Sequence, residues 1–255
     1  MILFVSDIHL GRDNLRNEHA NESALIHCLR AHEPDIEHLF LVGDVFDAFI
    51  EYRHLVPRGF VRFLALLAEW TDRGIPVTYL VGNHDPWHRD YFETELGVHV
   101  VFDSLLEFLD GRHIYLAHGD GLTVNARGYN LLKPLLRHPL PVALYRTILP
   151  GDFGMGLARW VKRRFGNTQI VEATVEGLRR HARSILANTV ADIVIMGHSH
   201  QPEDQTWPEG RYLNLGSWHD MGTFAELNEK GLCLLRWNGT CAEELNLDPV
   251  VDHPR

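Results

Sequence analysis

The N-terminal part of the chain alternates short apolar runs with longer stretches of helical periodicity. Apolar runs at residues 2–5, 39–42 and 77–81 are too short for helices and indicate buried strands. Between them, apolar positions recur at helical spacing in residues 21–30 and 60–70. Strands that alternate with helices predict an α/β fold with a parallel or mixed sheet, whose ligands bind beyond the carboxyl ends of the strands.

The C-terminal part carries further strand patterns. Residues 105–109 and 113–117 flank the dipeptide Asp110-Gly111, which is typical of a hairpin turn. The apolar run at residues 193–196 predicts another buried strand. Three late segments are expected to form antiparallel strands: 211–215, 224–227 and 232–237.

The segment between these strands has a different character. Residues 127–183 show helical periodicity with many large apolar side chains, and they carry 11 Lys and Arg against 3 Asp and Glu. We interpret residues 122–190 as a helical cap inserted within a single domain of residues 1–255. The alternative is a structural helical layer whose basic face is solvated.

Composition narrows the class of protein. The net charge of -10 argues against nucleic acid as a partner of the whole surface. Three scattered cysteines without a Cys-x-x-Cys pair fit a reducing cytoplasm. A candidate ligand as early as Asp7 leaves no room for a cleavable signal, and no apolar stretch of about 18 residues predicts a membrane span. We therefore expect a cytoplasmic protein.

Five short motifs end in side chains that bind metal ions, and most follow a predicted strand. The motifs are Asp7-Ile8-His9, Gly43-Asp44, Gly82-Asn83-His84-Asp85, His118-Gly119-Asp120 and Gly197-His198-Ser199-His200. They supply seven candidate ligands: Asp7, His9, Asp44, Asn83, His118, His198 and His200. This mixed set of oxygen and imidazole donors is too large for one ion and suits two ions that share a carboxylate, such as that of Asp44.

The donor types and the pairing predict the chemistry. Imidazole and carboxylate without thiolate suit divalent Mn, Fe, Zn or Co, and Mn2+ is the expected ion. Two ions about 3.5–4 Å apart lower the pKa of a shared water toward about 7 and neutralise phosphoryl oxygens, which favours in-line attack on phosphorus. The glycines before Asp44, Asn83 and His198 are expected to permit sharp turns at the strand ends.

Residues beside the ligands are candidates for catalysis and orientation. Asn83, His84 and Asp85 are the candidate catalytic residues, with His84 stabilising phosphoryl oxygens or protonating the leaving group. We expect Asp85 to accept a hydrogen bond from the His84 ring and so to fix its tautomer. Asp47 and Asp120 are expected to orient ligand imidazoles.

These motifs resemble those of the calcineurin-like metallophosphoesterase superfamily, whose five sequence blocks all find a match here, Asp47 included. The resemblance implies a four-layer α/β/β/α sandwich. It also implies one ion held by Asp7, His9, Asp44 and His200. The second ion would be held by Asp44, Asn83, His118 and His198.

A narrower resemblance, to the UDP-2,3-diacylglucosamine diphosphatases of lipid A biosynthesis, covers almost the whole chain. The resemblance rests on residues 43–49, residues 118–122, the pair Gly128-Tyr129, the basic insert and residues 215–219. Members of that family cleave the pyrophosphate of UDP-2,3-diacylglucosamine at the α-phosphorus, giving UMP and 2,3-diacylglucosamine 1-phosphate (lipid X).

The narrower resemblance also implies roles for the insert. Its apolar residues would hold acyl chains, and its basic residues, with Arg159, Lys162 and Arg163 as candidates, would meet the diphosphate or an anionic membrane surface. Peripheral contact with the cytoplasmic membrane would then run through the insert. Tyr129 and His84 would contact the substrate. The chain departs from many members in carrying His84 where they have arginine.

The residues alone leave two other functions open. One is a metal-dependent phosphodiesterase or phosphatase acting on another nucleotide or lipid phosphate, although a small polar substrate does not need a long apolar cap. The other is a non-catalytic scaffold, which has no need of all seven candidate ligands, yet none of them is replaced. The oligomeric state leaves no signature in the sequence.

Overall fold

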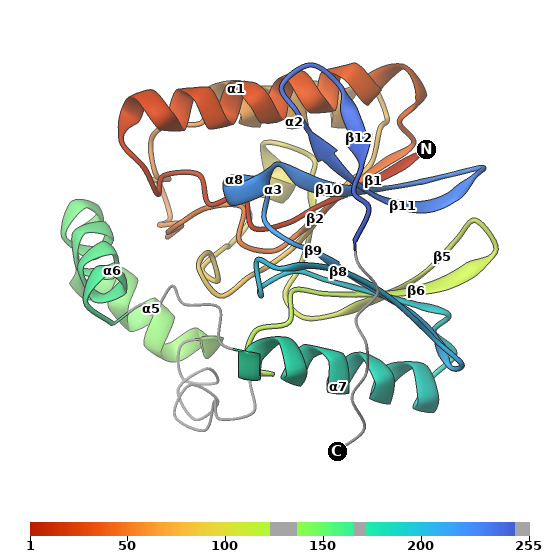
Figure 1. Cartoon of the computed structure of the whole chain (residues 1–255). Coiled ribbons are helices and arrows are strands. Elements are labelled where there is room, and N and C mark those ends of the chain that lie inside the picture. The colour runs from red at the N-terminus through yellow and green to blue at the C-terminus, as the bar shows by residue number, and fades with distance from the viewer. Residues whose placement is uncertain (123–136, 166–171, 248–255) are drawn as a thin grey trace.

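Two β-sheets lie face to face with helices on both outer faces (Figure 1). The computed structural model describes residues 1–122, 137–165 and 172–247, of which residues 161–165 are described by their backbone alone. Helices α1 and α2 cover the first sheet, and helix α7 covers the second (Figure 1). These four layers confirm the predicted α/β/β/α sandwich.

The first sheet has seven strands in the order β12-β11-β10-β1-β2-β3-β4. Their bounds are β1 Ile2–Val5, β2 His38–Val42, β3 Val77–Leu80, β4 His99–Val101, β10 Thr223–Asn228, β11 Gly231–Trp237 and β12 Ala242–Glu244. Strands β1 to β4 run parallel to one another, whereas β10 pairs antiparallel with β1. The carboxyl ends of the parallel strands therefore share one edge of the sheet.

The second sheet has five strands in the order β5-β6-β7-β9-β8. Their bounds are β5 Leu105–Leu109, β6 Arg112–Ala117, β7 Ile193–Met196, β8 Pro202–Trp207 and β9 Gly210–Leu215. The predicted hairpin of β5 and β6 is confirmed, with positive φ at both Asp110 and Gly111. The prediction that residues 211–215 form an antiparallel strand was wrong in part, because β9 is parallel to β7 and antiparallel only to β8.

The helices are α1 Leu15–His32, α2 Val61–Asp72, α3 Tyr91–Thr94, α5 Pro139–Ile148, α6 Gly151–Phe165, α7 Glu172–Asn188 and α8 Trp218–Met221, with a short 3₁₀ helix at Glu33–Asp35. Helix α1 begins earlier than the apolar pattern predicts. The Asn14 side chain caps it by accepting hydrogen bonds from the backbone amides of Arg16 and Asn17. Its first turns are largely exposed, so no apolar stripe marks them in the sequence.

Three apolar cores separate the four layers. Strand β1 shows why its run is wholly apolar: Leu3 and Val5 belong to the core beneath α1 and α2, while Ile2 and Phe4 belong to the core between the sheets. A third core joins α7 to the second sheet. A strand buried on both faces shows no alternation of polar residues.

Helices α5 and α6 lie to one side of the layers (Figure 1). They form part of the predicted insert, whose boundaries at residues 122 and 190 stay a prediction. No helix within the described ranges is long and apolar enough to cross a membrane.

Candidate metal centre

The seven candidate ligands come from the ends of five strands in both sheets. Asp7 and His9 follow β1, Asp44 follows β2, Asn83 follows β3, His118 follows β6, and His198 and His200 follow β7. The two sheets pack so that residues 191 positions apart in the sequence meet, as His9 and His200 do.

Five of these ligands have a backbone conformation that non-glycine residues rarely adopt. Asp7, His9, Asp44, His198 and His200 have φ angles of 51°, 49°, 52°, 69° and 57°. Among the residues that the structure describes, only Phe60 and Asp110 are other non-glycine residues with positive φ. A non-glycine residue in this region costs on the order of 1–3 kcal/mol and persists where the surroundings enforce it, which is typical of functional sites.

The glycines that precede the ligands are needed mainly because neighbouring atoms lie too close to leave room for a side chain. A Cβ atom on Gly82 would overlap the carboxylate and backbone nitrogen of Asp44, and one on Gly197 would overlap Asp7. Neither glycine has a positive φ, so the bends that follow them at residues 83–85 and 198–200 do not depend on a left-handed glycine. Gly43 meets both requirements, because its φ is 83° and a Cβ there would overlap the ring of His118.

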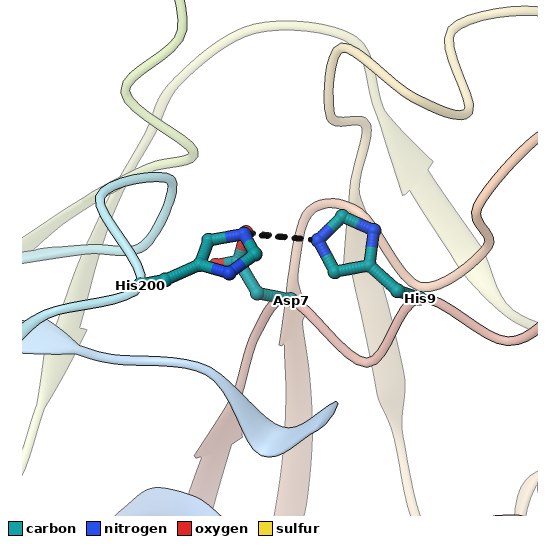
Figure 2. Close-up of side chains that lie close together, drawn as sticks. All are labelled: Asp7, His9 and His200. Carbon is teal, nitrogen blue, oxygen red and sulfur yellow. Dashed lines mark hydrogen bonds and ion pairs between the residues drawn. The ribbon is translucent and has the colours of Figure 1, made fainter. Parts of the chain in front are cut away.

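One group of ligand atoms comprises Asp7, His9 and His200 (Figure 2). The Nε2 atoms of His9 and His200 face each other at 3.0 Å, and the His200 Nε2 lies 3.2 Å from Oδ1 of Asp7. This Oδ1 atom is buried and accepts no hydrogen bond from the described residues. A buried carboxylate oxygen without a donor is costly, and a cation bound here would satisfy it.

A second group forms around Asp44. Its Oδ2 atom lies 3.3 Å from Nε2 of His118 and 3.7 Å from Nε2 of His84, and His198 completes one set of three ligand atoms. The Asn83 Oδ1 atom lies 3.1 Å from the same His118 nitrogen. Asp44 also belongs to a set with His9 and His84, so it links the two groups.

The donor set fits divalent cations. Within each set, the ligand atoms lie within 4.8 Å of one another. Two ligand atoms that each bind one ion at about 2.0–2.2 Å cannot lie farther apart than about twice that distance, which is similar to the spacing found here. The two groups joined through Asp44 therefore match the arrangement in which a carboxylate bridges two ions.

The charged side chains of this cluster shift one another's pKa values. Burial would raise the pKa of Asp7, but the nearby imidazoles of His200 and His9 hold it far below the usual value. Burial likewise opposes the charge on His118 and His200, yet Asp44 raises the pKa of His118 to about 10, and Asp220 and Asp7 raise that of His200 to about 9. Burial, together with the neighbouring His118, lowers the pKa of His198 to about 4.

These shifts predict a pH dependence of metal binding. Without metal, the raised pKa values keep His118 and His200 protonated at neutral pH, and a cation must displace those protons because only neutral imidazole ligates. The apparent affinity for Mn2+ should therefore rise between pH 6 and pH 8, by about tenfold per pH unit for each proton displaced. Titrations monitored by electron paramagnetic resonance, with proton release followed in weak buffer, would measure this. An affinity independent of pH would contradict protonated His118 and His200 in the metal-free protein.

Orienting contacts were only partly predicted from the sequence. Nδ1 of His200 lies 2.7 Å from Oδ2 of Asp220, a residue that was not singled out from the sequence although it directly follows the 215–219 block. The backbone oxygen of Val42 lies 3.1 Å from Nδ1 of His118. Oδ1 of Asp47 lies 3.9 Å from Nδ1 of His9, which is longer than a hydrogen bond, so the orienting role of Asp47 stays a prediction.

The structure gives Asp85 other partners than expected, whereas the orienting role of Asp120 stays a prediction. Asp120 forms an ion pair with Arg137 at 3.3 Å. Asp85 is buried and accepts hydrogen bonds from the backbone amides of Phe46 and Gly82 and from the Tyr79 hydroxyl, rather than from the His84 ring. Asp85 thus ties the turns after β2 and β3 together. Burial and the nearby Asp44 raise its pKa to about 6.

His84 lies among the ligands of the candidate metal centre, which is the position expected for a residue that contacts the substrate. Its ring is partly exposed, its Nδ1 lies 3.3 Å from the backbone oxygen of Asp47, and its Nε2 faces Asp44. The other predicted substrate contacts are less defined. Arg159 is exposed on α6; Lys162 and Arg163 lie on the part of α6 described by backbone alone, and Tyr129 lies outside the described residues.

A four-layer α/β/β/α sandwich with a mixed histidine and carboxylate cluster at its strand ends defines a metallophosphoesterase. A model of the calcineurin-like phosphoesterase family matches residues 1–202. The chain therefore belongs to the calcineurin-like phosphoesterase family.

Relatives within the family are similar over most of their length. The UDP-2,3-diacylglucosamine hydrolase of Porphyromonas gingivalis is 33% identical over 243 residues, which cover 88% of this chain and 92% of that protein. The protein of the same name from Stutzerimonas stutzeri is 29% identical over 244 residues, covering 91% and 96%. The solved structure of Yfce, a phosphoesterase from E. coli, aligns with 96% of this chain and 97% of its own at 17% identity and a TM-score of 0.47.

Proposed function

We propose that this chain hydrolyses the pyrophosphate bond of UDP-2,3-diacylglucosamine to UMP and 2,3-diacylglucosamine 1-phosphate. The observation that carries the proposal is a complete ligand cluster in a chain that aligns over 88% of its length with a UDP-2,3-diacylglucosamine hydrolase. Attack by water on the α-phosphorus breaks its bond to the bridging oxygen, which leaves with the sugar phosphate.

Different residues of the chain would hold the metal ions and contact the substrate. One ion would be held by Asp7, His9, Asp44 and His200, and the other by Asp44, Asn83, His118 and His198. When bound, the ions supply positive charge for the phosphoryl oxygens and activate the attacking water. The Asp47 carbonyl favours a proton on Nδ1 of His84, which leaves Nε2 directed at the site. With a second proton on Nε2, His84 would then donate a hydrogen bond to a phosphoryl oxygen or a proton to the leaving oxygen.

Mn2+ is the ion proposed for both positions, with Fe, Zn or Co as alternatives. A substrate panel tests the function and the metal together. With metal-loaded protein, we expect UMP release from UDP-2,3-diacylglucosamine at a rate at least about a hundredfold above that from UDP-N-acetylglucosamine, which lacks the acyl chains. A generic phosphodiester serves as the comparison for unspecific hydrolysis. Equal rates on all three compounds, or no release above a metal-free control, would overturn the proposal.

The cap helices are proposed to contact the inner face of the cytoplasmic membrane. Large apolar side chains are exposed on α5 and α6, among them Leu144, Phe153 and Trp160, with basic residues such as Arg159 beside them. Such a surface suits the interface of a membrane that contains anionic lipids.

Vesicle sedimentation tests the membrane contact. We expect Phe153→Ser and Trp160→Ser each to weaken binding to anionic vesicles about threefold to tenfold, since each removes apolar area from the interface. Phe108→Ser is the matched control, because this side chain is similarly exposed but lies on the β5–β6 hairpin. An equal loss in the control would contradict a membrane contact through the cap.

A further inference from the structure

The short helix α8 lies against the loop that carries Asp7, although none of its residues is a candidate ligand. The backbone amide of Trp218 donates to the backbone oxygen of Ser6 over 3.2 Å. The backbone amide of His219 donates to that of Asp7 over 3.1 Å. The hydroxyl of Ser217, which precedes the helix, also donates to the Asp7 backbone oxygen. These three hydrogen bonds fix α8 relative to the end of strand β1.

Other contacts fix α8 from its remaining sides. Trp218 is buried, and its indole Nε1 donates to Oδ1 of Asn21 on helix α1. Gly222 ends the helix with a φ of 68°, in the left-handed conformation that favours glycine at this position. The Ser217 hydroxyl caps the first turn by accepting from the backbone amide of Asp220. The backbone of Asp220 is therefore held by the fold and not by the contacts of its own side chain.

The Asp220 side chain reaches a candidate ligand on the side that faces away from the other ligands. Its Oδ2 atom lies 2.7 Å from Nδ1 of His200. The other ring nitrogen of His200, Nε2, lies 3.2 Å from Oδ1 of Asp7 and 3.0 Å from Nε2 of His9 (Figure 2). A neutral imidazole has one N–H group, so donation from Nδ1 to a carboxylate leaves the lone pair of Nε2 for a metal ion.

Two other ligand histidines differ from His200 in this respect. The backbone oxygen of Val42, and not a carboxylate, lies 3.1 Å from Nδ1 of His118. The Nδ1 atom of His9 is buried and has no hydrogen-bond partner among the described residues. A negative charge therefore lies behind a histidine of the first ligand group, whereas a neutral carbonyl lies behind His118 in the second.

A cation lies on the outer side of Asp220. Nη1 of Arg12 is 3.8 Å from Oδ1 of Asp220, the oxygen that does not face His200. The buried carboxylate of Glu18 fixes the loop of Arg12, because it accepts hydrogen bonds from the backbone amides on either side of this residue. The ion pair with Arg12 favours the conformation in which Asp220 faces His200.

We propose, resting on the ligand sets of the proposed function, that Asp220 is a positioning residue that acts through His200 on the ion held by Asp7, His9, Asp44 and His200. The carboxylate fixes the tautomer and orientation of the His200 ring and increases the basicity of its Nε2, as carboxylates behind metal-bound histidines do. Asp220 has no such contact with His118. Its removal should therefore weaken one metal position and leave the other unchanged.

Asp220→Asn tests this role, because it keeps the size of the side chain and removes its charge. The full-length chain is dialysed against a free Mn2+ concentration that just fills both positions of the unaltered chain. We expect the affinity of one position to fall about tenfold to a hundredfold, so that the variant retains about one ion per chain and loses the electron paramagnetic resonance signal of a spin-coupled pair. The Asp220 side chain is 42% exposed and the backbone contacts of α8 do not involve its carboxylate, so the variant should fold.

Nuclear magnetic resonance with excess Zn2+ shows whether the effect runs through His200. A downfield imidazole N–H proton, expected where Nδ1 donates to a carboxylate, should be present in the unaltered chain and absent from Asp220→Asn. Asp13→Asn is the matched control, because the Asp13 side chain is also 42% exposed and lies 3.7 Å from His219, which is not a candidate ligand. This control should retain both ions and the downfield proton.

The competing outcomes are distinguishable. Both ions retained in Asp220→Asn, or a downfield proton that persists in it, would overturn the role of Asp220. Loss of both ions from Asp220→Asn, or an equal loss in Asp13→Asn, would overturn it in favour of a general effect of charge. No substrate takes part, so if the substrate panel fails while Asp220→Asn loses one ion, the positioning role stands and the proposed function does not. If the panel succeeds while Asp220→Asn keeps both ions, only the role of Asp220 fails.

Discussion

Replacing Asp44 with alanine is expected to reduce hydrolysis at least about a thousandfold, because a metal pair contributes several kcal/mol and each 1.4 kcal/mol is a factor of ten. Asp44 is buried, its Oδ2 faces His118 and His84, and its Oδ1 accepts a hydrogen bond from the His84 backbone. Its removal takes a ligand from both groups at once. Metal analysis of the purified variant should show fewer bound ions than the unaltered chain.

The control for Asp44→Ala is Glu229→Ala, which removes an exposed acid from the turn between β10 and β11. It should leave both rate and metal content unchanged. Full activity in Asp44→Ala with a folded chain would contradict a site in which Asp44 joins the two groups.

Gly82→Ala should also have a large effect, although it removes no ligand. A Cβ at this position would overlap both the carboxylate and the backbone nitrogen of Asp44, so a change of rotamer cannot relieve the clash. We expect a loss of activity of at least about a hundredfold and a destabilisation of about 1–3 kcal/mol, typical of overpacking. Activity assays combined with chemical denaturation would measure both.

Gly156→Ala provides the matched control. This glycine lies within helix α6, and an added Cβ would meet no atom within 4 Å. Alanine favours the helix by up to about 1 kcal/mol, so the variant should be as active and slightly more stable. If Gly82→Ala behaved like Gly156→Ala, the close approach of Asp44 would not be the reason that position 82 requires glycine.

The fold was predictable where burial leaves a simple pattern. The strands that position the ligands, such as β1, β2 and β7, are buried on both faces and appear as short apolar runs. Each run is followed by its ligand motif, so the sequence also predicted which side chains would meet. The exposed first turns of α1 and the edge strand β8 lack such a pattern and were missed.

Contacts that depend on tertiary packing were not predictable. Asp220 reaches His200 only because α8 returns to the site, and nothing in its local sequence marks it. Asp85 was expected to pair with its neighbour His84, yet packing directs it to Tyr79 and two backbone amides.

Hydrolysis of UDP-2,3-diacylglucosamine in H₂¹⁸O shows which phosphorus atom the water attacks at this metal centre. Both products are analysed by mass spectrometry, for the unaltered chain and for Asp44→Ala. We predict one ¹⁸O atom in the phosphate of UMP and none in 2,3-diacylglucosamine 1-phosphate, with no turnover in Asp44→Ala. Label in the sugar phosphate, or labelled products formed equally by Asp44→Ala, would contradict attack on the α-phosphorus at the site that Asp44 joins.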